Sequence, residues 1–119
     1  MYSCLKAWGY RVSWLDGSVT GDKRLAAVDW FQDGRLDALL VQTQAGGTGI
    51  TLTRSNHCVT VELPWTDVAL KQAIARVHRI TQTREVTADI LSSACWLDEV
   101  MARIITTKAN AAARLLTDA

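Results

Sequence analysis

Short apolar runs alternate with helix-like patterns along most of this chain. The segments 10–15, 36–41, 57–63 and 85–91 have the length and composition of strands, whereas apolar residues recur at helical spacing in the segments between them. This alternation is typical of an α/β layer fold with a largely parallel sheet. From Ala94 to near the end, the pattern predicts one further helix with an apolar stripe.

The segment 67–78 is the expected helix with the most distinctive chemistry. At about 100° per residue, Gln72, Arg76 and Arg79 share one face, within roughly 60° of one another. The opposite face is apolar and consists of Leu70, Ile74 and Val77. Guanidinium groups held on a rigid element can stabilise charge that develops on a γ-phosphate. A solvated helix face with two ordinary arginines is the alternative for this segment alone.

A glycine-rich loop, 42–49, follows the expected strand 36–41. Gly46, Gly47 and Gly49 allow the backbone to approach a ligand closely and leave amides free to point at anions. No Gly-Lys-Ser/Thr follows, so the loop is not a Walker A sequence, and the chain contains no DEAD-like acidic tetrapeptide. The sequence therefore shows no means of holding a nucleotide and magnesium without help from another domain.

Composition excludes several classes of protein. The 119 residues are 49% apolar with a formal net charge of +1, which fits one folded domain without a global nucleic-acid signature. Cys4, Cys58 and Cys95 form no CxxC pair, so neither a disulfide framework nor a metal site is expected. No stretch is typical of a membrane span or a signal peptide, and we expect a cytoplasmic location, or a nuclear one in a eukaryote. The five tryptophans are expected mainly in the core.

Four motifs carry a family resemblance. They are Asp16-Gly17-Ser18 with Arg24, then Ala45 to Thr53, then Glu62 to Trp65, then Gln72 to Ile80 with Gln82. In this order and spacing, the chain resembles the second RecA-like lobe of SNF2-family ATP-dependent DNA translocases over nearly its whole length. The residues of its motifs are most similar to those of the annealing-helicase branch. The resemblance implies an α/β, RecA-like three-layer domain with a mostly parallel sheet that lacks its first strand. It also implies a lobe over 1–92 and a helical extension over 93–119 packed on it.

The resemblance also implies roles for individual residues. Arg76 and Arg79 match the arginines of helicase motif VI, which reach across the interlobe cleft to the ATP phosphates, and Arg79 is the stronger candidate for an arginine finger. Gln72 opens that motif and is expected at the cofactor.

The glycine loop matches motif V, which touches both the nucleotide site and the DNA backbone. Gly47 and Gly49 are expected on the nucleotide side of this loop, whereas Thr43 and Gly46 are expected on the nucleic-acid side. Arg24 is a further candidate for nucleic-acid contact, with a surface salt bridge as the alternative.

The implied function is that of a second motor lobe acting on double-stranded or branched DNA. ATP and Mg²⁺ would be held mainly by a first RecA-like lobe, supplied in cis or in trans, so the chain alone is not expected to hydrolyse ATP. Two alternatives stay open: a non-catalytic docking or nucleic-acid-binding module, and an RNA-directed helicase of the same superfamily.

Overall fold

The computed structural model describes residues 1–42, 49–62, 64–93 and 95–117, the last ten of these as backbone only. The elements follow one another as α1 (Tyr2–Ala7), β1 (Val12–Leu15), α2 (Asp22–Gln32), β2 (Ala38–Val41), β3 (His57–Thr60), α3 (Asp67–Ile74), β4 (Thr87–Ile90) and α4 (Trp96–Thr117). The predicted alternation of strands and helices is confirmed. The strands are shorter than the apolar runs that contain them, because pairing covers only part of each run.

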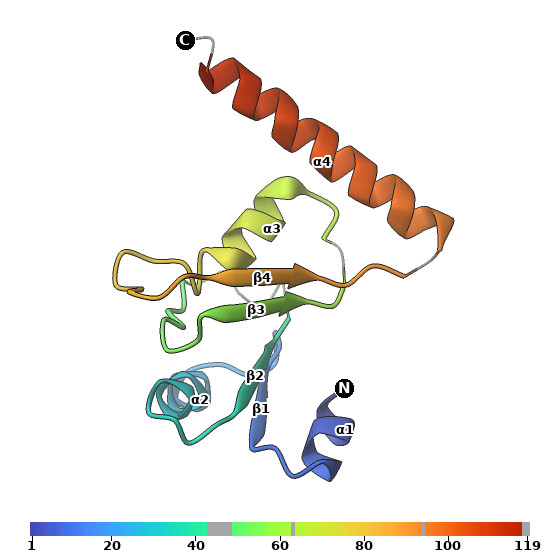
Figure 1. Cartoon of the computed structure of the whole chain (residues 1–119). Coiled ribbons are helices and arrows are strands. Elements are labelled where there is room, and N and C mark those ends of the chain that lie inside the picture. Colours follow the sequence, from blue (N-terminus) through green and yellow to red (C-terminus); the bar gives the residue numbers. More distant parts are fainter. Residues whose placement is uncertain (43–48, 63, 94, 118–119) are drawn as a thin grey trace.

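The strands pair in parallel, as predicted, but in two separate sheets. β1 pairs with β2 from Val12 beside Ala38 to Leu15 beside Val41, and β3 pairs with β4 from His57 beside Thr87 onward. Among the described residues, no pairing joins β2 to β3, so the expected single sheet is divided into two ribbons (Figure 1). An apolar cavity lies between these ribbons, and it is described with the site below.

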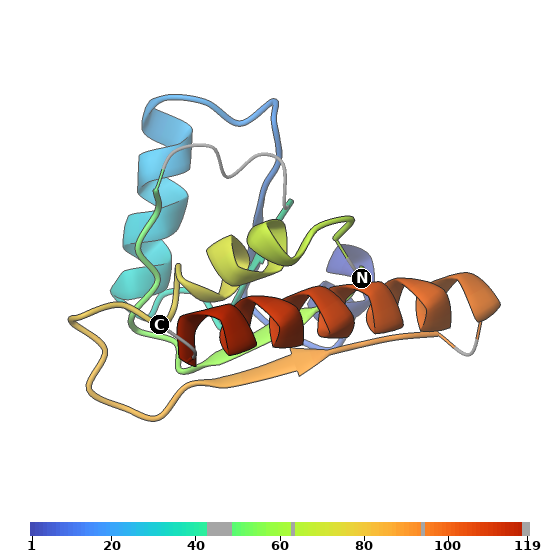
Figure 2. The same ribbon diagram turned by 90° about the horizontal axis from the view of Figure 1, so that it is seen from above.

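Helices flank both ribbons. Figure 1 shows α1 and α2 on opposite sides of the β1–β2 ribbon, and Tyr2 of α1 meets Trp14 of β1 edge to face at 4.5 Å between ring centroids. Figure 2 shows the long helix α4 passing over the β3–β4 ribbon on the side where α3 also lies. Within α4, Ile105 is buried. The arrangement matches the layered α/β prediction.

The main hydrophobic cluster joins three parts of the chain. Phe31 of α2, Leu52 of the connection after the glycine loop and Val77 after α3 pack together, with partly buried residues of β2 and β3 around them. The prediction that the tryptophans are mainly core residues is wrong. All five tryptophans are between 45% and 75% exposed.

A charged clamp aligns the beginnings of β1 and β2. The Arg11 side chain donates to both carboxylate oxygens of Asp37, at 3.0 Å from Nε and 2.6 Å from Nη2, and the Arg11 amide donates to the same carboxylate at 2.8 Å. The Asp37 amide in turn donates to the Arg11 carbonyl at 2.8 Å. These bonds, led by those from the Arg11 side chain, lower the pKa of Asp37 from 3.8 to about 2.

Asp37→Asn is therefore expected to remove a pH-dependent part of the stability. A carboxyl with a depressed pKa stabilises the fold above its unfolded value, and this contribution is lost as the pH falls from about 4 to about 2. Thermal unfolding of both proteins between pH 2 and pH 6 measures it. The two melting temperatures should converge towards pH 2, and a constant difference across this range would contradict the assignment.

Candidate functional site

The helix that carries the candidate arginines ends earlier than predicted. α3 begins after Thr66, whose hydroxyl accepts from the Ala69 amide at 3.2 Å, and ends at Ile74. Beyond it, the Arg76 amide bonds to the carbonyl of Ala73, three residues back. The segment 75–81 is therefore a series of turns, and the prediction of a continuous helix over 67–78 is wrong.

One backbone hydrogen bond links the turns after α3 to the connection that follows the glycine loop. The carbonyl of Arg76 accepts from the Leu52 amide at 2.8 Å, whereas in a continuing helix it would accept from residue 80. Leu52 and Val77 pack together in the core beside this bond. The predicted apolar seam is nevertheless present, because Leu70 and Val77 are both buried. The connection thus holds the turns after α3 by one backbone bond and by core packing.

These turns bring three guanidinium groups together. The pKa of Arg76 is lowered first by burial of its side chain and then by the positive charges of Arg24 and Arg79. A Cβ added to Gly49 would lie only 3.2 Å from Nη2 of Arg79, so this guanidinium lies directly over the Gly49 backbone. We call Arg24, Arg76 and Arg79 the arginine cluster. Guanidinium groups form strong, charge-assisted hydrogen bonds with phosphate and carboxylate, so an anion is the kind of ligand that suits this cluster.

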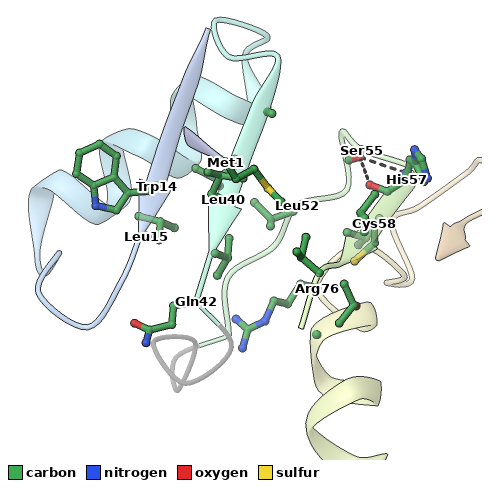
Figure 3. Close-up of a pocket in the computed structure, with 18 of the residues that line it drawn as sticks. Met1, Trp14, Leu15, Leu40, Gln42, Leu52, Ser55, His57, Cys58 and Arg76 are labelled. Atoms are coloured by element: carbon green, nitrogen blue, oxygen red, sulfur yellow. Dashed lines mark hydrogen bonds between the residues drawn. The ribbon is translucent and has the colours of Figure 1, made fainter. Parts of the chain in front are cut away.

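The arginine cluster borders a large cavity between the two ribbons. The cavity has a volume of about 940 Å³, and its lining includes Asp16 and Gln42, which directly follow β1 and β2, together with Arg76. Figure 3 shows the Arg76 side chain directed towards the end of β2 at which Gln42 lies. In open α/β sheets, ligands bind in the crevice outside the carboxyl ends of the strands. Among the three arginines of the cluster, Arg76 lines the cavity in that position.

Gln82 is a positioning residue whose role was not predicted from the sequence. Its Nε2 donates to the carbonyls of Ser55 at 2.7 Å and Thr53 at 3.0 Å, with a longer contact of 3.4 Å to the Val77 carbonyl. Its Oε1 accepts from the Arg84 amide at 3.2 Å. One amide thus fastens the connection after the glycine loop to the turns that carry the arginines. The sequence shows that Gln82 belongs to the motif. It does not show which groups Gln82 contacts, because these lie about 30 residues away.

Gln82→Ala is expected to destabilise the domain by about 1–3 kcal/mol, because part-buried carbonyls lose their donor. Chemical denaturation measures this change. Gln72→Ala is the matched control, since Gln72 is exposed on α3. Equal stability of the two variants would show that the Gln82 bonds contribute nothing.

The structure describes only some of the remaining predicted site residues. Gln72 is an exposed residue of α3, and no described contact joins it to the arginine cluster. Thr43, Gly46 and Gly47 lie outside the described residues. Arg24 lies close enough to Arg76 to act on its charge, so it belongs to the cluster.

Two other kinds of feature do not occur among the described residues. No group of three or more histidine, cysteine or acidic side chains there could hold a metal ion. No described helix is long and apolar enough to cross a membrane.

Comparison with known proteins defines the class to which this fold and site belong. The family described as the helicase conserved C-terminal domain matches residues 1–81. The crystal structure of the C-terminal part of the Fun30 ATPase domain superposes with a TM-score of 0.80 at 28% identity, covering 87% of this chain and 34% of that one. The chain belongs to the helicase conserved C-terminal domain family, and its RecA-like α/β fold is confirmed.

Similar relatives place the chain among SNF2-family helicases. Helicase SWR1 of Mycosarcoma maydis is 38% identical over 85 residues, which are 71% of this chain and 5% of that protein. The human DNA annealing helicase and endonuclease ZRANB3 is 36% identical over 97 residues, which are 81% of this chain and 9% of that protein. These similar identities leave the annealing-helicase branch a prediction. The chain spans only 5–12% of the length of such relatives.

Proposed function

We propose that this chain acts as the second motor lobe of an ATP-dependent, SNF2-like DNA helicase or translocase, with Arg76 and Arg79 as its arginine fingers. The arginine cluster carries the proposal. Arg76 lines the cavity and Arg79 lies over Gly49, and guanidinium groups at these two places could form charge-assisted hydrogen bonds with a phosphate chain.

Of the two fingers, Arg79 is the one suited to reach a nucleotide on another lobe. Arg79 is exposed, whereas Arg76 is half-buried and its backbone carbonyl is bonded to Leu52. Arg76 would thus hold the cluster in place and add positive charge next to Arg79. Arg79 would extend across an interlobe cleft. An arginine provided by a second lobe couples closure to hydrolysis, because charge stabilisation is complete only when the cleft is shut.

The residues present fit the phosphates of ATP better than its magnesium ion. The cluster is cationic, and no group of three or more histidine, cysteine or acidic side chains that could hold a metal occurs among the described residues. ATP with Mg²⁺ would therefore be held mainly by a first RecA-like lobe, in cis or in trans. When bound, ATP would supply the phosphoryl group whose developing charge the arginines stabilise. Gln72, Gly47 and Gly49 are proposed as further contacts at the nucleotide.

Double-stranded or branched DNA is the proposed track. Thr43 and Gly46 would contact its backbone, with Arg24 supplying positive charge, and such contacts do not depend on base sequence. We further propose that the motor lobe spans 1–92 and that 93–119 is a helical extension packed on it, a division supported by the contact between α3 and α4.

Reconstitution with a separately produced first lobe tests this function. The chain, the first lobe and the two together are assayed for ATP hydrolysis without nucleic acid, with duplex DNA and with RNA. Hydrolysis is expected only in the mixture and should be stimulated by duplex DNA. A stable complex without hydrolysis would favour the non-catalytic docking module. Stronger stimulation by RNA would favour the RNA-directed helicase.

A further inference from the structure

The Arg54 side chain binds the C-terminal end of α2. Arg54 belongs to the connection after the glycine loop, and its Nη1 donates to the Phe31 carbonyl at 3.2 Å. The Arg54 amide donates to Oε1 of Gln32, the last residue of α2, at 3.1 Å. A cation is favourable at this end of a helix, because the last carbonyls lack donors within the helix. Arg54 therefore fastens the connection to α2 by both its side chain and its backbone.

Gly34 leaves the space that the Arg54 guanidinium occupies. α2 ends in a turn in which Gly34 has a φ of +82°, and the Gly34 amide donates to the Phe31 carbonyl at 3.2 Å. A Cβ added to Gly34 would lie within 2.7 Å of Cζ and both Nη atoms of Arg54. Any side chain at position 34 would therefore displace this guanidinium. The place of the Arg54 side chain thus depends on a glycine at the end of α2.

The same connection also holds the turn that carries Arg79. The Gln82 amide donates to the Arg79 carbonyl at 2.8 Å. The Gln82 side chain donates to the carbonyls of the two residues on either side of Arg54. In addition, Nη2 of Arg84 donates to the Arg54 carbonyl. A short series of hydrogen bonds thus joins the Arg79 turn to the backbone at Arg54, and the Arg54 side chain joins that backbone to α2.

We propose that Arg54 is a positioning residue for Arg79. It holds the connection on α2, and the connection holds the turn from which the Arg79 side chain extends. The inference rests on the proposed role of Arg79 at a phosphate chain. Arg54 itself lies at the opposite end of α2 from Arg24, so it acts without touching the phosphates. Without Arg54, the Arg79 turn is held less firmly, and binding of phosphate then costs more conformational entropy.

The test measures phosphate binding to the whole chain with and without a change in charge. Arg54→Ala removes the guanidinium, whereas Gly34→Ala displaces it and keeps every charged group. Inorganic tripolyphosphate is titrated into each isotopically labelled protein, and Kd is obtained from the NMR shift of the Arg79 Nε–Hε resonance. We expect each variant to have an at least fivefold weaker Kd. The double variant should bind no more weakly than Arg54→Ala, because the clash and the strain of Gly34→Ala are separated by this cycle.

Two further arginine variants complete the comparison. Arg35→Ala removes another exposed arginine, directly after Gly34, and should change Kd less than twofold. Arg54→Lys keeps a charged donor for the Phe31 carbonyl and should bind within about threefold of the wild type. Because this variant retains the anchoring contact, it also tests the inference if Arg54→Ala fails to fold, which the amide spectrum shows. Arg54→Lys that binds as weakly as Gly34→Ala would then count against it.

The outcomes separate the role of Arg54 from the proposed phosphate site. Equal Kd values for Arg54→Ala and Arg35→Ala would overturn the inference alone, provided that the wild type binds. A Gly34→Ala effect of the same size in the Arg54→Ala background would also overturn it, since backbone strain would then be the cause. A wild-type chain whose Arg79 resonance does not shift would contradict the proposed phosphate site, and this inference with it.

Discussion

Arg79→Ala in the complex with a first lobe is expected to lower DNA-stimulated kcat for ATP hydrolysis by about 10³-fold or more. An arginine finger acts on charge that develops in the transition state, and its removal costs on the order of 10³–10⁵ in kcat. KM for ATP should change much less, because the first lobe holds most of the nucleotide. Steady-state kinetics with saturating duplex DNA separates the two parameters.

Two further variants make this result specific to the finger. Arg79→Lys retains a positive charge but lacks the planar fork, so it should recover only part of the lost rate. Arg35→Ala removes another exposed arginine, whose nearest carboxylate is that of Asp33 at 3.8 Å, and it should leave kcat unchanged. If Arg79→Ala and Arg35→Ala had the same kcat, Arg79 would not be a finger.

Leu52→Ala is expected to destabilise the domain by about 2–5 kcal/mol, the usual cost of a cavity at a buried leucine. Leu52 is 7% exposed and packs with Phe31 and Val77, so its loss loosens α2 and the turns of the arginine cluster together. This cost is a large fraction of the roughly 5–15 kcal/mol that stabilises a typical domain. Denaturant unfolding followed by circular dichroism measures the change.

A leucine on the surface provides the comparison for Leu52. Leu25 lies on α2 and is 63% exposed, so Leu25→Ala should change the free energy of unfolding by less than about 0.5 kcal/mol. Since alanine favours helix, a small gain is also compatible with this expectation. Equal losses for Leu25→Ala and Leu52→Ala would contradict the placement of Leu52 in the core.

Local patterns were sufficient for the elements of the fold. The apolar runs predicted all four described strands, and the apolar spacing of Leu70 and Val77 correctly identified buried positions. The family prediction was also confirmed, because it rested on motif order rather than on any one segment. Local patterns placed the end of this helix too late, at 78 and not at Ile74. The bond from the Leu52 amide to the Arg76 carbonyl, which holds the turns beyond α3, joins distant segments and has no signal in a local pattern.

Long-range geometry accounts for what the sequence missed. Gln72, Arg76 and Arg79 were expected together on one helical face, yet the helix ends at Ile74, and turns bring the two arginines towards Arg24. The role of Gln82 depends on carbonyls in a distant segment. Within the ranges that the structure describes, β2 and β3 are not paired, and neither apolar run carries a local signal for that division into two ribbons.

The central claim, that Arg76 and Arg79 form a site for a phosphate chain, can be measured on this chain without a first lobe. Inorganic tripolyphosphate is titrated into the isotopically labelled protein, and the Nε–Hε resonances of its arginines are followed by NMR. The account predicts saturable shifts for Arg76 and Arg79, weakened by added salt, with little change at Arg35. Shifts no larger at Arg76 and Arg79 than at Arg35 would contradict it.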